Sequence, residues 1–511
     1  MRASIKMKAN KTGRLQPHQI RVVRAMMSLK NRGLVVYHDM GSGKTLTSIA
    51  VAENLMNKHT NLKTTVICPA SLKANFEKEL DKWNVDSKRY TVYSYETFAR
   101  RKSDGICKNT LLIVDEAHRI RNPPLLRKKH GGGVGISGVV TQRVIKCAHQ
   151  AFKVLLLTGT PVHNYPSDLA TLLGGISKTV LSRDGFTQQM STVKGMRSLL
   201  GCKISYYKPP VGDDHFPSVK RVDVIVPMKP NQYEQYKAFE ENEMSGDIED
   251  VLLSTTGLAD TNKLKTFFNG ARRFCNIIGD SFPKAEVLVR KIQRGEVNSK
   301  HLVYSTFKAQ GLNIISRILN EKGLKHAIFT GDIKMDKRKR ILEKYNNGSI
   351  KILLISSAGA EGLDLKRTGY VHILEPHWND EKIKQVIGRA ARYDSHKGLR
   401  RSKQTVKVYR YYAKKPVEEM NAPRPSELEF KNSEVPGKIM RLLQSEDLKA
   451  FDKHYIQAVT RDPWVLPTVD IYLKNIARYK QYTNERFLKY VKNLSIENQA
   501  CFSSGSKLSF T

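Results

Sequence analysis

The segment Met40-Gly41-Ser42-Gly43-Lys44-Thr45 has the composition of a loop that binds phosphate. Glycines let backbone N–H groups turn toward phosphate oxygens, and the start of a following helix adds partial positive charge. In such a loop Lys44 contacts the β and γ phosphates of a nucleotide, and the hydroxyl of Thr45 binds Mg²⁺. The full pattern also has a glycine at position 38, where this chain has His38 followed by Asp39. The loop from His38 to Thr45 is the candidate nucleotide site.

Two adjacent carboxylates form the second chemical feature. Asp115 and Glu116 directly follow the apolar run Leu111-Leu112-Ile113-Val114, so they emerge at the carboxyl end of a predicted buried strand. Asp115 would hold Mg²⁺ through its water shell, and Glu116 would orient and deprotonate an attacking water. The four-residue string Asp115-Glu116-Ala117-His118 is weak evidence alone. Together with Lys44 it predicts hydrolysis of a nucleoside triphosphate.

The second half of the chain has arginines but no second phosphate loop, since Ser357–Gly362 lacks a following Lys-Thr. Within Gln385–Arg392, the side chains of Arg389 and Arg392 are three residues apart, on one face of a predicted helix. Such arginines can stabilise charge on a γ-phosphate in the transition state. The alternative is a solvated basic helix face.

These residues lie between short apolar runs that alternate with segments of helical period, which indicates parallel sheets covered by helices. In the first stretch the predicted strands are 34–37, 64–68, 90–93, 110–114 and 154–157. In the second they are 301–305, 326–330, 350–355, 370–374 and 406–412. The chain therefore divides into an α/β domain (1–203), a proline-punctuated connector with helices (204–280), a second α/β domain (281–413) and a helical C-terminal extension (414–511).

The charge composition of the chain indicates which classes of partner it binds. Lys and Arg number 87 against 48 Asp and Glu, a formal charge of +39, which favours a polyanion: nucleic acid first, an anionic membrane second. The chain has no apolar run long enough for a membrane-spanning helix, and its first residues lack the apolar core of a secretion signal. We expect an intracellular protein that does not cross a membrane. The six cysteines have no metal-ligand spacing and are expected to be reduced, mostly buried thiols.

The order of these motifs resembles that of the superfamily 2 helicase-type ATPases over roughly positions 15 to 412. The segments that carry the resemblance are the glutamine motif Leu15–Gln19, motif I Gly41–Thr45, motif Ia Pro69–Leu72, the DEAH motif II Asp115–His118, motif III Leu157–Pro161, motif V Ser357–Asp364 and motif VI Gln385–Arg392.

The resemblance implies two RecA-like parallel-sheet domains in tandem, with ATP and Mg²⁺ as cofactors. Gln19 would read the adenine, and His118 would couple the nucleotide state to Thr158 and Thr160. Residues in the family's backbone-contact motifs would grip nucleic-acid phosphates without reading sequence. These residues are Ser71, Lys73, Tyr95, Thr97, Thr306 and Ser357.

More specific sequence similarities indicate a branch within superfamily 2. Thr158–Pro161 with Asn164 resembles the SWI/SNF-type translocases, which favours duplex DNA over RNA. Strings such as Tyr206-Tyr207-Lys208 and Val469-Asp470-Ile471-Tyr472-Leu473 are similar to the poxvirus-type transcription ATPases of large DNA viruses. That likeness implies RNA polymerase or transcription factors as partners and, for a viral protein, a cytoplasmic replication site or the virion. The alternatives are a DEAH-type RNA helicase, or a DNA-binding transcription subunit with a weak ATPase.

Overall fold

The computed structural model describes residues 15–28, 31–101, 105–121, 136–160, 162, 166–179, 181–209, 215–243, 261–295, 299–357, 363–377, 380–416 and 468–498. It consists of two compact units. The first unit is Met1–Asp213 with Tyr482–Thr511, and the second unit is Asp214–Gln481. Each contains a six-stranded sheet within the described residues, and the strand pairs that define both sheets are parallel. This confirms the predicted α/β class with two parallel-sheet units.

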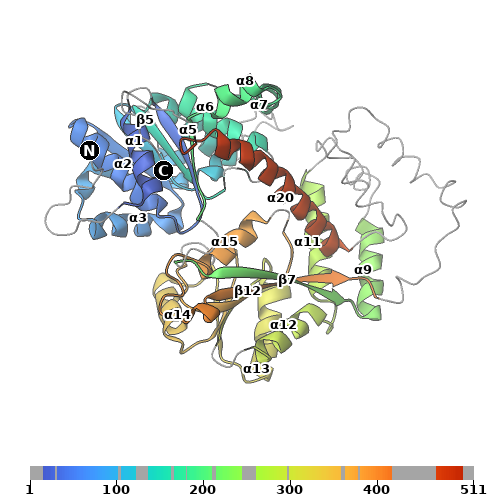
Figure 1. Ribbon diagram of the computed structural model, residues 1–511. Helices are drawn as coiled ribbons and strands as arrows, with labels where there is room; N and C mark the ends of the chain where they lie inside the picture. Colours follow the sequence, from blue (N-terminus) through green and yellow to red (C-terminus); the bar gives the residue numbers. More distant parts are fainter. Residues whose placement is uncertain are drawn as a thin grey trace, which may run out of the picture. The chain divides into compact units, whose positions relative to one another are not determined.

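The sheet of the first unit, of which β5 is labelled in Figure 1, has the strand order β3-β2-β4-β5-β1-β6. Its strands are β1 (Gly33–His38), β2 (Lys63–Cys68), β3 (Tyr90–Ser94), β4 (Thr110–Val114), β5 (Lys153–Thr158) and β6 (Ile204–Tyr207). Its helices are α1 (Pro17–Met27), α2 (Lys44–Lys58), α3 (Ala70–Lys82), α4 (Tyr95–Arg100), α5 (Ile136–Gln150), α6 (Leu169–Ser177), α7 (Arg183–Met190) and α8 (Val193–Leu200). The five predicted strands are all present.

Both faces of this sheet are buried, which explains the continuous apolar runs. Leu112 and Leu156 belong to one core cluster, together with residues of α5 and α6. Ile113 and Leu155, their neighbours along the strands, belong to the cluster on the other face with residues of α1 and α2. Because all strands run the same way, the loops that follow β1, β4 and β5 meet at one edge of the sheet.

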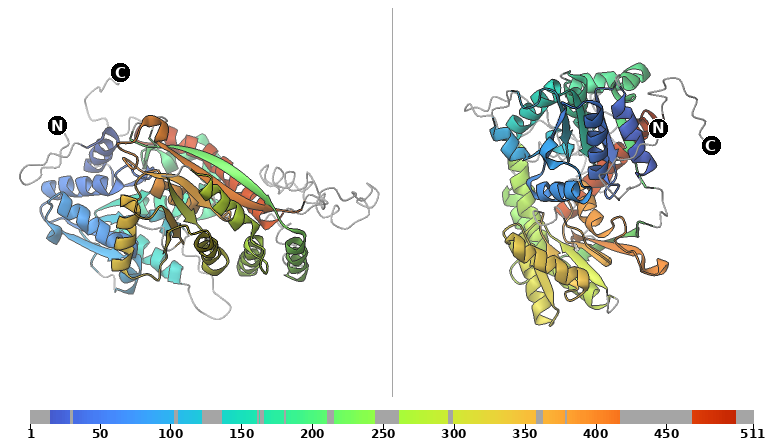
Figure 2. Two further views of the ribbon diagram at one scale, coloured as in Figure 1. Left: turned by 90° about the horizontal axis from the view of Figure 1, so that it is seen from below. Right: turned by 90° about the vertical axis from the view of Figure 1, so that its left-hand side faces the viewer.

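The sheet of the second unit has the order β7-β12-β11-β8-β10-β9. Its strands are β7 (Ser218–Pro227), β8 (Lys300–Tyr304), β9 (His326–Phe329), β10 (Ile352–Ile355), β11 (Thr368–Ile373) and β12 (Thr405–Lys414). Its helices are α9 (Pro230–Glu243), α11 (Thr261–Asn276), α12 (Pro283–Gln293), α13 (Ile314–Glu321), α14 (Met335–Asn347) and α15 (Glu381–Ala390). The long strand β7 runs beside β12 along its full length (Figure 2).

The connector expected at 204–280 is divided between the two sheets. Strand β6 pairs with β1 in the first unit, and β7 pairs with β12 in the second. Helices α9 and α11 pack together beside β12, as expected for helices that decorate a connector. Of the expected C-terminal extension, residues 417–467 lie outside the described part of the chain, and a long helix, α20 (Val469–Asn493), follows.

Helix α20 is anchored at both ends by buried side chains. At its start, Asp470 accepts a hydrogen bond from the buried ammonium of Lys284 at 2.6 Å, within the second unit. Near its end, Phe487 and Val491 belong to a core cluster of the first unit. The boundary between the units falls inside the helix, after Gln481. The predicted helical character of this tail is present where the structure describes it.

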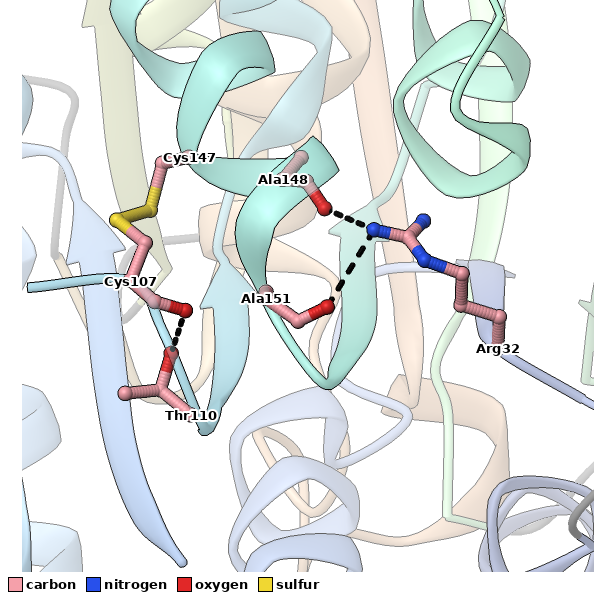
Figure 3. Close-up of a disulfide and its surroundings, with 6 residues drawn as sticks. All are labelled: Arg32, Cys107, Thr110, Cys147, Ala148 and Ala151. Atoms are coloured by element: carbon pink, nitrogen blue, oxygen red, sulfur yellow. Dashed lines mark hydrogen bonds between the residues drawn. A yellow bond between two sulfur atoms is a disulfide. The ribbon is translucent and has the colours of Figure 1, made fainter. Parts of the chain in front are cut away.

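The expectation of reduced cysteines is wrong for part of the set. Cys107, just before β4, forms a disulfide with Cys147 of α5 (Figure 3). Cys202 is also disulfide-bonded, whereas Cys68 and Cys275 are free and buried. Sequence spacing missed the pair because only the fold brings positions 40 residues apart together. No helix in the described part of the chain is long and apolar enough to span a membrane.

Candidate nucleotide site

The phosphate loop connects the end of β1 to the start of α2. Gly41 and Gly43 have φ angles of 78° and 77°, a left-handed conformation that favours glycine. The ammonium group of Lys44 folds back over the loop and donates hydrogen bonds to the carbonyl oxygens of His38 at 2.9 Å and Asp39 at 3.2 Å. The backbone therefore has the conformation of a phosphate cradle, with its cation held inside it.

His38, the departure from the phosphate-loop pattern, has an extended backbone as the last residue of β1 and so needs no glycine. Its buried imidazole points toward strand β6, where Nε2 lies 2.8 Å from the hydroxyl oxygen of Ser205. Burial, with the nearby His18 and the charge of Lys44, holds the pKa of His38 well below its usual range. The ring is therefore neutral near pH 7.

The glutamine motif lies against the same loop. The side-chain amide of Gln19 donates to the carbonyl oxygens of Ser42 at 3.4 Å and Gly43 at 3.3 Å. Its oxygen accepts from the backbone N–H of Gln16 at 2.8 Å. A Cβ atom at Gly43 would lie 2.6 Å from Nε2 of Gln19, so a side chain here would displace the Gln19 amide, and the φ of 77° disfavours other residues in any case. Adenine recognition by Gln19 stays a prediction.

Sequence reasoning did not find the aromatic contact next to Gln19. The ring of His18 stacks on Tyr207 at the end of β6, with centroids 3.6 Å apart and planes 8° from parallel. One ring nitrogen of His18 lies 3.0 Å from the carbonyl oxygen of Ser42. The phosphate loop is thus supported from one side by α1 and β6. In the sequence, Tyr206-Tyr207-Lys208 was notable for its similarity to the poxvirus-type transcription ATPases, and not for an aromatic contact.

The two carboxylates of motif II follow β4, as predicted. The backbone N–H of Glu116 donates to Oδ1 of Asp115 at 2.9 Å, and Glu116 has a left-handed φ of 52°. Burial raises the pKa of Asp115, and the charge of Glu116 raises it further; the charge of Lys44 opposes both effects. A buried carboxylate of this kind is stabilised by a nearby cation.

Motif II is linked to motif III through His118. Nδ1 of His118 lies 3.3 Å from Oε2 of Glu116 and 3.4 Å from the hydroxyl oxygen of Thr158. That hydroxyl also accepts from the backbone N–H of Thr160 at 3.0 Å. The structure therefore brings together the residues expected to couple nucleotide state to motif III. The same loop lies against the phosphate loop, since a Cβ at Gly159 would be 3.6 Å from Nζ of Lys44.

The expected nucleic-acid contacts of the first unit differ in exposure. Ser71 and Lys73 are exposed on the first turns of α3. The backbone N–H and the hydroxyl of Thr97 both bond the Ser94 hydroxyl at the start of α4. Tyr95 corrects the expectation: it is buried, and its hydroxyl donates to the carbonyl oxygen of Asp115 at 2.7 Å. Its side chain supports motif II from inside and does not face a surface ligand.

In the second unit, Thr306 and Ser357 follow β8 and β10 at the carboxyl edge of the sheet. The Ser357 hydroxyl lies 2.8 Å from that of Tyr304. The backbone N–H of Thr306 donates to Oε2 of Glu375 at 3.0 Å. Glu375 is buried and also accepts from Ser305 at 2.5 Å, a support that sequence reasoning missed because an isolated Glu after a strand carries no signal.

The two arginines of motif VI do not share a helix face. Helix α15 ends at Ala390, so Arg389 lies in its last turn and Arg392 comes after it. Nη1 of Arg392 is 3.9 Å from Oδ1 of Asp364, a loose ion pair at a half-exposed position. The helix ends early because Ala391 leaves helical geometry, with φ −101° and ψ 77°.

The fold and the site define an α/β nucleotide-binding protein of the helicase type. Residues 18–103 match the SNF2-related domain, and residues 283–394 match the helicase conserved C-terminal domain. The chain belongs to the superfamily 2 helicases, a family of ATP-dependent helicases and ATPases.

Its relatives include proteins of large DNA viruses. A protein of Acanthamoeba polyphaga mimivirus, named as a putative ATP-dependent RNA helicase, is 34% identical in an alignment 417 positions long, which covers 78% of this chain and 88% of that protein. A termination factor NPH-I homolog of African swine fever virus is 24% identical in an alignment 510 positions long, which covers 75% of this chain and 69% of that protein. The structure of the SWI2/SNF2 ATPase core of Sulfolobus solfataricus, solved with dsDNA, aligns with 89% of this chain and 96% of its own, with 20% sequence identity and a TM-score of 0.36.

Proposed function

We propose that this protein is a nucleic-acid-stimulated ATPase that translocates on or remodels duplex DNA, in transcription or DNA processing of a large DNA virus. The single observation that carries the proposal is the meeting of Lys44, motif II and Thr158 at one edge of the first sheet. That arrangement supplies a phosphate cradle, a carboxylate pair and a path to a neighbouring loop.

The loop residues His38, Asp39, Met40, Gly41, Ser42, Gly43, Lys44 and Thr45 bind the phosphates of ATP, and Gln19 contacts the adenine. The donor set fits Mg²⁺, which takes hard oxygen ligands: the Thr45 hydroxyl at the start of α2 and the Asp115 carboxylate after β4. A buried carboxylate with a raised pKa supports this fit, because a cation would favour its charged form. The metal would neutralise charge on the phosphates during transfer.

Glu116 orients and deprotonates the attacking water in this proposal. Its carboxylate lies next to His118, so a change at the γ-phosphate is passed to Thr158 and the loop after β5. Arg389 and Arg392 stabilise the charge that develops on the γ-phosphate. Hydrolysis then changes which motif loops are held, and this shift of population drives stepping.

Nucleic acid is held without reading sequence by exposed or half-exposed groups on the motif loops. The net charge of +39 supports a polyanionic ligand, and the viral relative named as a termination factor supports a role in transcription. The contact residues are Ser71, Lys73, Thr97, Thr306 and Ser357. Protein partners of this activity would be RNA polymerase or transcription factors.

A second candidate is an RNA helicase, which the mimivirus relative's name favours. One experiment separates the two: steady-state phosphate release measured with no nucleic acid, with single-stranded DNA, with duplex DNA and with RNA of equal length. Stronger stimulation by duplex DNA supports the proposal, and stronger stimulation by RNA supports the RNA helicase. Binding of DNA with no turnover under any condition would indicate a binding subunit with a vestigial ATPase.

A further inference from the structure

The segment that follows α20 is built into the edge of the first sheet beside the nucleotide site. The backbone N–H of Ile496 donates to the carbonyl oxygen of Ile204 at 2.9 Å, and that of Cys202 donates to Leu494 at 3.2 Å. These bonds hold the segment along β6, the edge strand next to β1. Residues nearly three hundred positions after β6 in the sequence thus form part of its surroundings.

Glu497 contacts β6 with both carboxylate oxygens. Oε1 accepts a hydrogen bond from the hydroxyl of Ser205 at 2.5 Å, and Oε2 accepts from the backbone N–H of Tyr206 at 2.7 Å. Ser205 is fully buried, and its oxygen also lies 2.8 Å from Nε2 of His38. The carboxylate therefore fixes a buried hydroxyl that touches the first residue of the phosphate loop.

The direction of these hydrogen bonds follows from the donors that each group has. A serine hydroxyl has one proton, and here it is donated to Glu497, so the Ser205 oxygen accepts from His38. Nε2 of His38 then carries the ring proton and Nδ1 does not. Nδ1 is buried and has no hydrogen-bond partner among the described residues, which agrees with an imidazole held by one nitrogen alone.

Lys44 contacts the backbone of His38, at the opposite end of this series of hydrogen bonds from Glu497. The carbonyl oxygen of His38 accepts from the Lys44 ammonium at 2.9 Å. A phosphate loop with glycine at position 38 has no side chain there to hold. In this chain the side chain is present, large and buried, so its anchor helps to determine where the carbonyl and the lysine lie.

We propose that Glu497 is a positioning residue for the ATP site: through Ser205 it orients His38, and His38 sets the position of Lys44. The inference deepens the ATP-binding role of the phosphate loop and is independent of any nucleic-acid partner. It assigns the segment just after α20 a role in nucleotide binding.

The test measures ATP affinity, KM and kcat without nucleic acid, for Glu497→Gln and Ser205→Ala, singly and together. Gln keeps the shape of Glu497 but presents an N–H to Tyr206 or to Ser205. We expect each single variant to raise the Kd and KM for ATP by about three- to tenfold with a smaller change in kcat, and the double variant to equal the singles. The control Glu343→Gln removes the same charge from an exposed position of α14 in the second unit and should leave all three values unchanged.

A second experiment uses His38→Gly, which restores the full phosphate-loop pattern and removes the side chain through which Glu497 and Ser205 act on Lys44. In that background, Glu497→Gln should have no further effect on ATP affinity, even if it lowers the melting temperature. The proposal is overturned if Glu497→Gln and Ser205→Ala leave ATP affinity unchanged, or if their effects persist undiminished with His38→Gly. If His38→Gly does not fold, additive effects of the other two variants overturn it. A wild-type protein that binds ATP but fails to hydrolyse it would contradict the proposed function and leave this test intact.

Discussion

The carbonyl oxygen of His38 accepts a hydrogen bond from the ammonium group of Lys44, so the residue that departs from the phosphate-loop pattern also locates the loop's cation. A bound triphosphate would offer Lys44 charged oxygens in place of a neutral carbonyl. We predict that Lys44→Ala lowers ATP hydrolysis by about 100- to 1000-fold, the cost of removing one preorganised donor at a phosphate. Phosphate release measures this, with Lys58→Ala at the exposed far end of α2 as control. Unchanged hydrolysis would show that the site is misassigned.

Glu116 should matter for the chemical step and little for binding. We predict that Glu116→Gln reduces kcat by about 100- to 10,000-fold, the usual contribution of a general base, while ATP affinity stays within about threefold. The amide keeps the contact distance to His118 but cannot accept a proton. Single-turnover hydrolysis and nucleotide binding measured on one preparation separate the two effects. Glu343→Gln, exposed on α14, is the matched control. Equal losses of binding and turnover would instead mean that Glu116 holds the metal or the loop.

The charge argument predicts a steep response of nucleic-acid binding to salt. Each phosphate neutralised on B-DNA changes log K by about 0.9 per unit of log salt concentration. We expect Lys73→Gln, at an exposed position of α3, to reduce that slope by about one and to weaken binding equally across sequences. Fluorescence anisotropy at four salt concentrations tests this, with Lys339→Gln on α14 as control. A flat salt response of the wild-type protein would remove the electrostatic basis of the proposal.

Burial on both faces gives a strand its clearest signal in the sequence, and β4 is the example. Thr110–Val114 was predicted with the bounds that β4 has, because each of its residues is apolar or small and fully enclosed. Strand β7 was missed because it is an edge strand with mostly exposed or half-exposed residues, including Lys220, Arg221 and Asp223. Nothing near it in sequence indicates its partner β12, which lies almost two hundred residues further on.

In the site too, features set by the strand pattern were predictable from the sequence, and contacts between distant segments were not. Parallel strands place the residues after them at one edge, so the meeting of Lys44, Asp115 and Thr158 was predictable. The burial of Tyr95 under motif II depends on the course of its own helix over the sheet, which periodicity does not determine. The contact of Glu497 with Ser205 joins distant segments through a single pair of polar side chains, for which sequence has no local signal.

The disulfide between Cys107 and Cys147 encloses motif II in a loop of about 40 residues. Closing a loop of that length lowers the entropy of the unfolded chain and should stabilise the first unit by about 4 kcal/mol. We predict that Cys107→Ser with Cys147→Ser lowers the melting temperature by about 10 °C under non-reducing conditions. Reductant should bring the parent protein toward the variant. Alkylation and mass spectrometry of the native protein provide the control: free thiols at both positions, or equal melting temperatures, would contradict the prediction.

Two buried histidines in the second unit should make its stability depend on pH. Nδ1 of His301 lies 3.1 Å from Nε2 of His372, and Nδ1 of His372 lies 2.9 Å from the Tyr411 hydroxyl. Burial lowers the pKa of His301 to about 4, and burial with the charges of His301 and Lys291 lowers the pKa of His372 well below its usual range.

Because both pKa values are lower in the folded state, the unfolded chain binds more protons between pH 6.5 and about 4, and stability falls as pH falls through that window. His301 alone should cost about 2 kcal/mol at pH 5 relative to pH 7. We predict that His301→Gln flattens the decrease in unfolding free energy between pH 7 and pH 5, measured by urea denaturation with circular dichroism. His59→Gln, in the first unit, is the comparison and should leave the slope of the wild-type protein in place. Parallel pH profiles for wild type and His301→Gln would show that this buried pair does not control acid stability.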